Sequence, residues 1–240
     1  MANVGYIALF LALPASIYAA VAFIYGMRRK HLALLHSARN SLFAACGLVS
    51  ISVAILLYAL ITHDFSIEYV ASYTSRDLSL PYLISALWAG NDGSLLFWAW
   101  LLTIFAVVVI VRKRKTGNEL VPYAVAVIMA TQAFFIILLL WISNPFQLLP
   151  SAPPMGEGLN PLLENPGMFF HPPFLLAGYI GFTIPFAFAI AALLIAVMIA
   201  LRMISDRRVL EHRIRCGHAR GAGCSHDCSK KDTDAGTGTG

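Results

Sequence analysis

Residues 4–26 read VGYIALFLALPASIYAAVAFIYG and contain no charged side chain. A helix of about 20 apolar residues crosses the roughly 30 Å hydrocarbon core of a bilayer, so this block predicts a transmembrane helix. Four further apolar blocks follow at about residues 41–62, 94–111, 121–142 and 174–201. The whole chain of 240 residues is 59% hydrophobic and 12% charged, whereas soluble domains carry about 25% charged residues. We therefore expect an all-α, polytopic membrane helix bundle with about five transmembrane helices.

The first block has no charged stretch before it and no A-x-A cleavage pattern after it, so we expect a retained span and not a signal peptide. Pro14 and Pro185 fall inside apolar blocks. Membrane helices tolerate proline better than soluble helices do. We expect a kink at each of these two prolines, without a break in the helix.

Basic residues alternate along the connections between the blocks. Residues 27–40, 112–119 and 202–208 are rich in Lys and Arg, residues 63–93 contain one arginine, and residues 143–173 contain neither type. Because Lys and Arg collect in cytoplasmic loops, the alternation predicts that the N-terminus and both long connections lie outside. For a bacterial cytoplasmic membrane this is the periplasmic side. The net charge of +5 thus reflects topology, and no basic stripe interleaved with aromatics points to nucleic acid.

The first long connection contains a short apolar piece, YLISALW at residues 82–88, which predicts a helix lying along the membrane surface. The sequence AGNDGS at 89–94 ends it, and Asp92 or Ser94 is suited to cap the next helix. Three tryptophans surround this break: Trp88, Trp98 and Trp100. They form either an aromatic belt at the membrane boundary or a flat shelf for a planar ligand. In the second case Gly90 and Gly93 would allow the ligand close to the backbone.

The second long connection is punctuated by prolines and ends in LENPGMFFHPPFLLAGYIGF at residues 163–182. We expect a short helix closed by a turn at residues 165–167, and Pro172 with Pro173 in the first turn of the last span. His171 would then lie one residue outside that helix. A neutral imidazole can bind a metal, including haem iron. The alternative is an interfacial histidine bonded to a loop carbonyl, since no spacing singles out Glu157 or Glu164 as an acid–base partner.

Several of these motifs together resemble the CcmF-type cytochrome c biogenesis proteins, which are membrane haem lyases. The resemblance rests on DFSIEYVA (64–71), ALWAGNDGSLLFW (86–98), NPF (144–146) and LNPLLENPGMFFHPPFLLAGYIGFTIPFAFAIAALL (159–194), and it covers about residues 1–205. It implies haem as the cofactor, with a haem chaperone and apocytochrome c as partners. Such proteins hold haem at the outer face between two histidines and present it to CxxCH motifs, where thioether bonds form.

Carried over residue by residue, the resemblance implies that His171 matches the first outer histidine and is an axial haem ligand. Trp88, Gly90, Gly93, Ser94 and Trp98 match the family's first aromatic motif and would support the site near the haem. The family's chain is far longer, and its W-G-x-x-W-x-W-D-P segment, second outer histidine and intramembrane histidines are absent here. His63 is another candidate for the second ligand, without support from a motif.

These departures predict the N-terminal portion of a haem lyase, in a CcmF-like membrane domain over residues 1–205, that needs a partner chain carrying the missing half. The chain would be either a natural split protein or a truncation, and we do not expect it to be active alone. Two alternatives stay open. One is a membrane transporter of haem or a small solute, although no charged residue lies inside the five blocks and no internal repeat is visible. The other is an inactive scaffold fragment.

The last 35 residues depart from the family pattern. Residues 206–240 lack hydrophobic periodicity and end in a Gly-rich run, which favours a disordered cytoplasmic tail. Cys216, Cys224 and Cys228 form an alternative zinc site, but only the last two have a spacing usual for zinc ligands. Cys46 lies inside a span, where we expect it to be a small buried residue.

Overall fold

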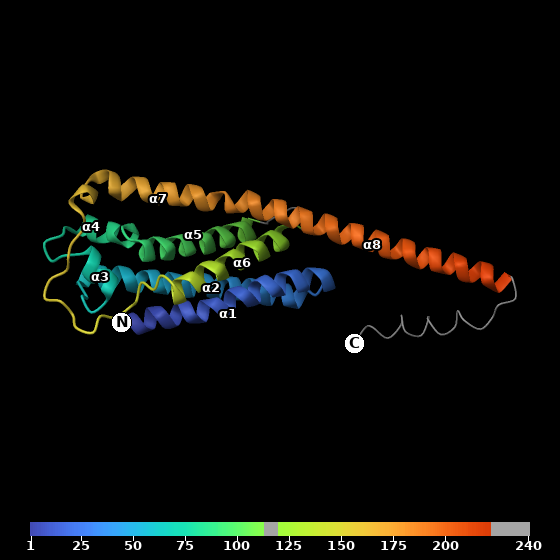
Figure 1. Ribbon diagram of the computed structural model, residues 1–240, viewed down its shortest axis with the longest axis horizontal. Helices are drawn as coiled ribbons and strands as arrows, with labels where there is room; N and C mark the ends of the chain where they lie inside the picture. The colour runs from blue at the N-terminus through green and yellow to red at the C-terminus, as the bar shows by residue number, and fades with distance from the viewer. Residues whose placement is uncertain (113–119, 222–240) are drawn as a thin grey trace. The chain divides into compact units, whose positions relative to one another are not determined.

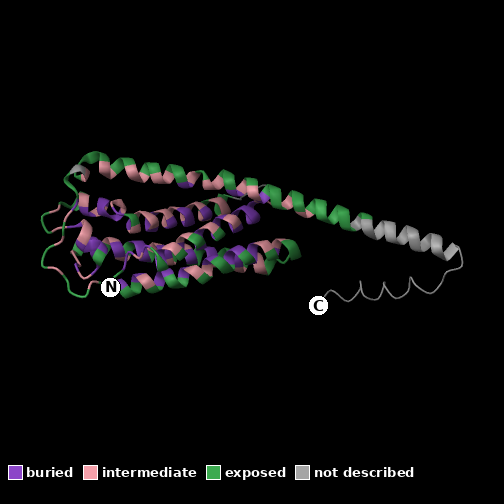
Figure 2. Cartoon of the chain, in the orientation of Figure 1, coloured by how far each residue is buried: buried purple, intermediate pink, exposed green. Residues whose placement is uncertain are grey.

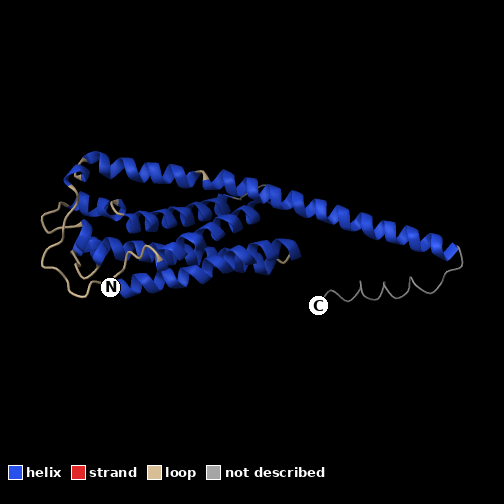
Figure 3. Ribbon diagram, in the orientation of Figure 1, coloured by secondary structure: helices blue, strands red, loops and turns tan. Residues whose placement is uncertain are grey.

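The computed structural model describes residues 1–112 and 120–221 of the chain. The long helices are α1 (Ala2–Arg29), α2 (Leu32–Thr62), α5 (Asn91–Arg112), α6 (Leu120–Trp141), α7 (Pro166–Gly181) and α8 (Thr183–Gly221). Short helices α3 (Glu68–Tyr73), α4 (Leu80–Ser85), η1 (Ala86–Trp88) and η2 (Pro161–Leu163) lie in the connections, and Figure 3 shows helix or loop throughout the described part. Five stretches are long and apolar enough to span a membrane, the last being Pro166–Ser205. The all-α, five-span prediction is confirmed.

The chain divides into two compact units, Met1–Ala192 and Leu193–Gly240. The described part of the second unit is the continuation of α8. It runs past the predicted boundary at residue 205 as far as Gly221. Residues 222–240 lie outside the described residues, so the expected disordered tail stays a prediction.

Four helices of the first unit form a closed ring. Helix α1 packs on α2 and α6, and α5 packs on the same two helices, so each neighbours two others (Figure 1). Helix α7 lies outside this ring, against α5 and α4. Figure 2 shows the consequence: buried residues line the inner faces of the ring, while α7 is largely exposed.

The tightest pair, α1 and α2, is built on small residues at heptad spacing. The buried positions on α1 include residues 2, 5, 9, 12, 16, 19, 23 and 26, and those on α2 include 38, 42, 45, 49, 52, 56 and 59. Alternating steps of three and four keep one stripe facing the partner helix. Gly, Ala and Ser on the stripe let membrane helices approach closely, since van der Waals packing and hydrogen bonds drive their association. The Ser52 hydroxyl accordingly donates to the Gly5 carbonyl at 2.9 Å.

Two of the helix ends are closed by non-glycine residues in the left-handed region. Lys30 after α1 has φ 53° and His63 after α2 has φ 54°. In each case the following amide reaches back to the helix: His31 N donates to the Gly26 carbonyl at 2.9 Å, and Asp64 N to the Ala59 carbonyl at 3.0 Å. These bonds satisfy carbonyls that the helix ends would otherwise leave free.

The two predicted proline kinks turned out differently. Pro14 lies within α1, which continues through it without a break. Near Pro185 the helix is interrupted at Phe182, between α7 and α8, although the backbone there keeps right-handed helical angles. The interruption falls one turn before the proline because Pro185 lacks the N–H that would bond the Gly181 carbonyl and its ring crowds that turn.

Both long connections gather at one end of the ring, the end that holds the N-terminus (Figure 1). They are joined by backbone hydrogen bonds: Leu149 N donates to the Ser66 carbonyl at 2.9 Å and Glu157 N to the Ala71 carbonyl at 2.8 Å. The basic residues Arg28 and Arg29, in the last turn of α1, lie at the opposite end. The two connections therefore share one side of the membrane, and which side this is stays a prediction.

Candidate functional site

The segment around His171 begins a helix earlier than we predicted. Asn165 is the N-cap of α7, and its side-chain oxygen accepts from the Met168 amide at 3.2 Å. Pro166 follows in the first turn, where a missing N–H costs nothing. The expected closing turn at residues 165–167 thus opens α7, and the prediction that His171 lies one residue outside a helix is wrong: it lies inside α7. Asparagine followed by proline fits a helix start as well as a turn, and the side-chain cap decides between them.

Pro172 and Pro173 consequently lie in the interior of α7. In a helix the N–H of residue i bonds the carbonyl of residue i−4. A proline at 172 therefore leaves the Met168 carbonyl without its helical donor. The Trp88 indole supplies one instead, since its Nε1 donates to the Met168 carbonyl at 3.0 Å. This bond fastens the turn that carries His171 to the segment between α4 and α5.

Two aromatic rings and a hydrogen bond to its backbone carbonyl also hold Trp88 in place. Its ring lies 5.6 Å from that of Phe97 and 6.0 Å from that of Phe169, centroid to centroid. Ser94 donates its hydroxyl to the Trp88 carbonyl at 3.0 Å. We expected Ser94 or Asp92 to cap α5 from outside, but α5 begins at Asn91, so both lie in its first turn.

The other two tryptophans separate. Trp100 joins the same cluster through Phe97, with ring centroids 5.8 Å apart, and donates its indole N–H to the Ser50 hydroxyl of α2 at 2.9 Å. Trp98 points elsewhere, toward Phe135 of α6. Its Nε1 is buried and has no hydrogen-bond acceptor among the described residues. The structure therefore joins Trp88 to Trp100 and leaves Trp98 outside their cluster.

Gly90 and Gly93 make room for two tyrosines of the chain itself. A side chain at Gly90 would collide with the Tyr73 ring and come within 2.8 Å of the Tyr69 ring, and one at Gly93 would come within 2.6 Å of Tyr69 Cζ. The Tyr69 hydroxyl donates to the Ala86 carbonyl at 2.7 Å and accepts from the Gly90 amide at 3.1 Å. Sequence reasoning missed this tyrosine, although DFSIEYVA contains it.

Burial raises the pKa of Tyr69 well above that of a free phenol. Its hydroxyl therefore stays protonated and keeps its role as donor to the Ala86 carbonyl across the pH range in which proteins function.

His171 itself is exposed. Its side chain makes no hydrogen bond to another described residue, so the alternative of a histidine bonded to a loop carbonyl has no support in the described part of the chain. Its neighbours are apolar and exposed: Phe170 is 61% exposed and Phe174, one turn further on, 76%. An imidazole free to bind a metal beside open aromatic surface can hold one axial position of a planar, apolar cofactor.

The described residues do not bring a second ligand to His171. No group of three His, Cys, Asp or Glu residues that could hold a metal ion occurs in residues 1–112 and 120–221. His63 is the C-cap of α2 and contacts the Phe65 ring, and its Nε2 is buried with no hydrogen-bond partner among the described residues. The zinc prediction rests on Cys216, whose side chain is not described, and on Cys224 and Cys228, which lie outside the described residues.

Residues 88–224 match the family described as Cytochrome C assembly protein. The chain belongs to this family. It is 34% identical over 195 residues to the cytochrome c-type biogenesis protein CcmF of Haemophilus influenzae. The aligned region covers 81% of this chain and 30% of the relative. It is 36% identical over 197 residues to CcmF of Escherichia coli K12, again with 81% and 30% covered.

Among solved structures, the cytochrome c haem lyase CcmF superposes with a TM-score of 0.66 at 26% identity, over 80% of this chain and 30% of that one. The family resemblance predicted from the sequence is thereby confirmed: the chain corresponds to the N-terminal part of a CcmF-type protein. It spans about 30% of the length of the relatives it matches.

Proposed function

We propose that this chain is the N-terminal, haem-holding portion of a cytochrome c haem lyase. In this role it would act in c-type cytochrome maturation together with a partner that carries the rest of the family's length. Membership of the cytochrome c assembly family supports the process. The chain spans about 30% of the length of these relatives.

His171 carries the proposal. Its imidazole is exposed and unbonded within the described part, and Phe170 and Phe174 offer apolar surface beside it. These features fit one axial ligand and one edge of a haem site. Haem, when bound, would supply the iron that His171 ligates and the vinyl groups to which cysteine thiols are joined. Pro172 and Pro173 restrict the backbone next to His171 and so limit the positions its ring can adopt.

The residues of the aromatic motif act, in this proposal, as support. Trp88 fixes the first turns of α7 through the Met168 carbonyl. Ser94 fixes Trp88, and Gly90 and Gly93 admit the tyrosines that hold the same segment. Trp98 would steady the contact between α5 and α6 at the aromatic ring of Phe135. None of these side chains needs to touch the cofactor to position His171.

The partner would supply the second axial ligand. The exposed aromatic residues along α7 and the start of α8 give it an apolar surface to pack on: Phe170, Phe174, Tyr179, Phe182 and Phe186. We propose that both long connections face the periplasm, where a haem chaperone would deliver haem and apocytochrome c would receive it. The excess of Lys and Arg at the other end of the helices supports this orientation.

Haem retention tests the proposal. The chain is purified with its partner in mild detergent, and bound haem is measured as the pyridine haemochrome for wild type, His171→Ala and the control His36→Ala, an exposed histidine at the basic end. We expect haem to be lost only with His171→Ala and to return when imidazole is added, since a free ligand can replace the missing side chain. Equal haem in all three samples would overturn the role of His171, and loss without imidazole rescue would reduce it to a structural one.

A further inference from the structure

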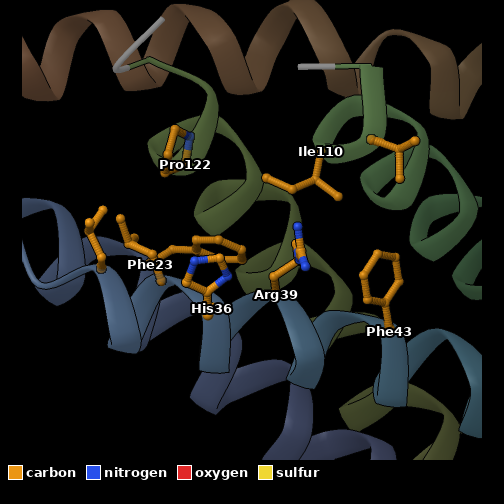
Figure 4. A pocket seen from close by; sticks show the side chains of 9 residues that line it. Phe23, His36, Arg39, Phe43, Ile110 and Pro122 are labelled. Carbon is orange, nitrogen blue, oxygen red and sulfur yellow. The ribbon is translucent and has the colours of Figure 1, made fainter. Parts of the chain in front are cut away.

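A pocket of about 500 Å³ lies among the basic ends of the four ring helices, at the opposite end of the ring from the two long connections. Most of its lining comes from one face of α2, formed by positions 32, 35, 36, 39 and 43: Leu32, Leu35, His36, Arg39 and Phe43. Phe23 of α1, Ile110 and Val111 of α5, and Pro122 of α6 complete it. Figure 4 shows the Arg39 and His36 side chains rising from α2 toward Ile110 and Pro122.

The charge of this pocket is uncompensated among the described residues. Arg39 is exposed and forms no ion pair or hydrogen bond there. The four helices that line the pocket contain a single acidic residue, Asp92, at the far end of α5. Arg28, Arg29 and Arg112 lie at the same end as Arg39 but do not line the pocket, so Arg39 is the arginine that faces it. The pocket therefore attracts an anion and disfavours a cation.

The depth of Arg39 in the membrane points to a lipid headgroup. Helix α2 has 31 residues and is about 46 Å long, which exceeds the roughly 30 Å hydrocarbon core. Arg39 lies about 35 Å from the Thr62 end of the helix, so with Thr62 at one edge of the hydrocarbon core Arg39 lies just beyond the other edge, where headgroups begin. Phe43 lies one turn deeper, at the level of the acyl chains, and is 39% exposed, as Val111 is 56% exposed. The Arg39 guanidinium at headgroup level, next to the exposed apolar side chains of Phe43 and Val111, suits a ligand that has an anionic headgroup and apolar chains.

We propose that this pocket binds an anionic phospholipid such as phosphatidylglycerol. The Arg39 guanidinium would donate to the phosphate oxygens in a charge-assisted pair. His36 would line the headgroup, and the acyl chains would lie against Phe43, Ile110 and Val111. Basic pockets between membrane helices bind headgroups of this kind. Phosphatidylcholine carries the same phosphate, but its choline would find no carboxylate among the described residues that line the pocket, so we expect a preference for lipids of net negative charge.

Competition between two lipids tests the proposal. The full chain is placed in nanodiscs that contain phosphatidylglycerol and phosphatidylcholine in equal amounts, and retention of phosphatidylglycerol over phosphatidylcholine is measured by native mass spectrometry for wild type, Arg39→Gln and Arg28→Gln. Arg28→Gln is the matched control, because it removes the same charge from the same end without touching the pocket. We expect the preference for phosphatidylglycerol to fall about fivefold in Arg39→Gln and to stay near the wild-type value in Arg28→Gln.

A second variant separates the pocket from its charge. Val111→Trp fills the space without changing the charge, at a position that is 56% exposed and so tolerates the larger side chain. We expect it to abolish the preference as Arg39→Gln does, with circular dichroism unchanged. Equal loss in Arg28→Gln and Arg39→Gln would assign the effect to the basic surface at large. No preference in the wild type, or full preference with the pocket filled, would overturn the proposal.

Discussion

The hydrogen bond between the Trp88 indole and the Met168 carbonyl should matter because Pro172 removes the helical alternative. Replacing Trp88 with Phe leaves that half-buried carbonyl without a donor. The lost bond at 3.0 Å is worth about 1 kcal/mol, and an unmatched carbonyl costs roughly 1–3 kcal/mol. We expect Trp88→Phe to lower the free energy of unfolding by about 2 kcal/mol and to speed amide exchange in the first two turns of α7.

A double-mutant cycle with Pro172→Ala isolates this effect. Alanine at 172 restores the N–H that bonds the Met168 carbonyl in a regular helix, so Trp88→Phe should then cost about 1 kcal/mol less. The loss of ring volume is the same in both backgrounds and cancels. Unfolding is followed in detergent micelles by near-ultraviolet circular dichroism, and exchange by mass spectrometry.

Trp100→Phe is the matched control. Trp100 also contacts Phe97 and also donates its indole N–H, but to Ser50 of α2 at 2.9 Å. Its replacement should lower stability without changing exchange in α7, and Pro172→Ala should not alter its cost by more than about 0.5 kcal/mol. If Trp88→Phe costs the same with and without Pro172, the carbonyl has another partner and the reasoning fails.

Three further predictions concern single positions, each checked by the same unfolding measurement. Gly93→Ala should destabilise the protein by about 2 kcal/mol, since its Cβ would collide with Tyr69. Gly47→Ala has open space around it and should be neutral or stabilise the protein by up to about 1 kcal/mol. Equal effects of the two substitutions would refute the packing argument. Gln132→Leu should stabilise by about 1–3 kcal/mol, because both polar atoms of this buried side chain lack partners among the described residues; destabilisation would reveal an acceptor or donor there. The raised pKa of Tyr69 predicts a contribution to stability that is present below about pH 10, where the unfolded phenol ionises, and is lost as pH rises further. Tyr69→Phe should reduce the slope of the free energy of unfolding against pH in that range by one proton. An unchanged slope would contradict the prediction.

The position of the site was only partly predictable. His171, Trp88 and both glycines could be singled out because their motifs resemble a family. The start of α7 could not, since an Asn-Pro-Gly sequence suits a turn and a helix start alike, and only the bond from the Met168 amide to Asn165 distinguishes them. A helix that begins at Pro166 has Pro172 and Pro173 in its interior. The Met168 and Phe169 carbonyls then lack helical donors, because proline has no N–H.

The sequence by itself determined the class of the protein and its elements. Apolar blocks long enough to cross a bilayer leave helices as the way to satisfy their backbone, and the basic residues between them gather at one end. Tertiary structure alone decided which helices neighbour each other and what the glycines are for. These helices are apolar on every side, because lipid and protein interior are equally apolar, so hydrophobicity marks no packing face. The contacts of small residues, Tyr69 and Trp88 decide it instead, and these exist only once α1, α2, α5 and α6 have closed their ring.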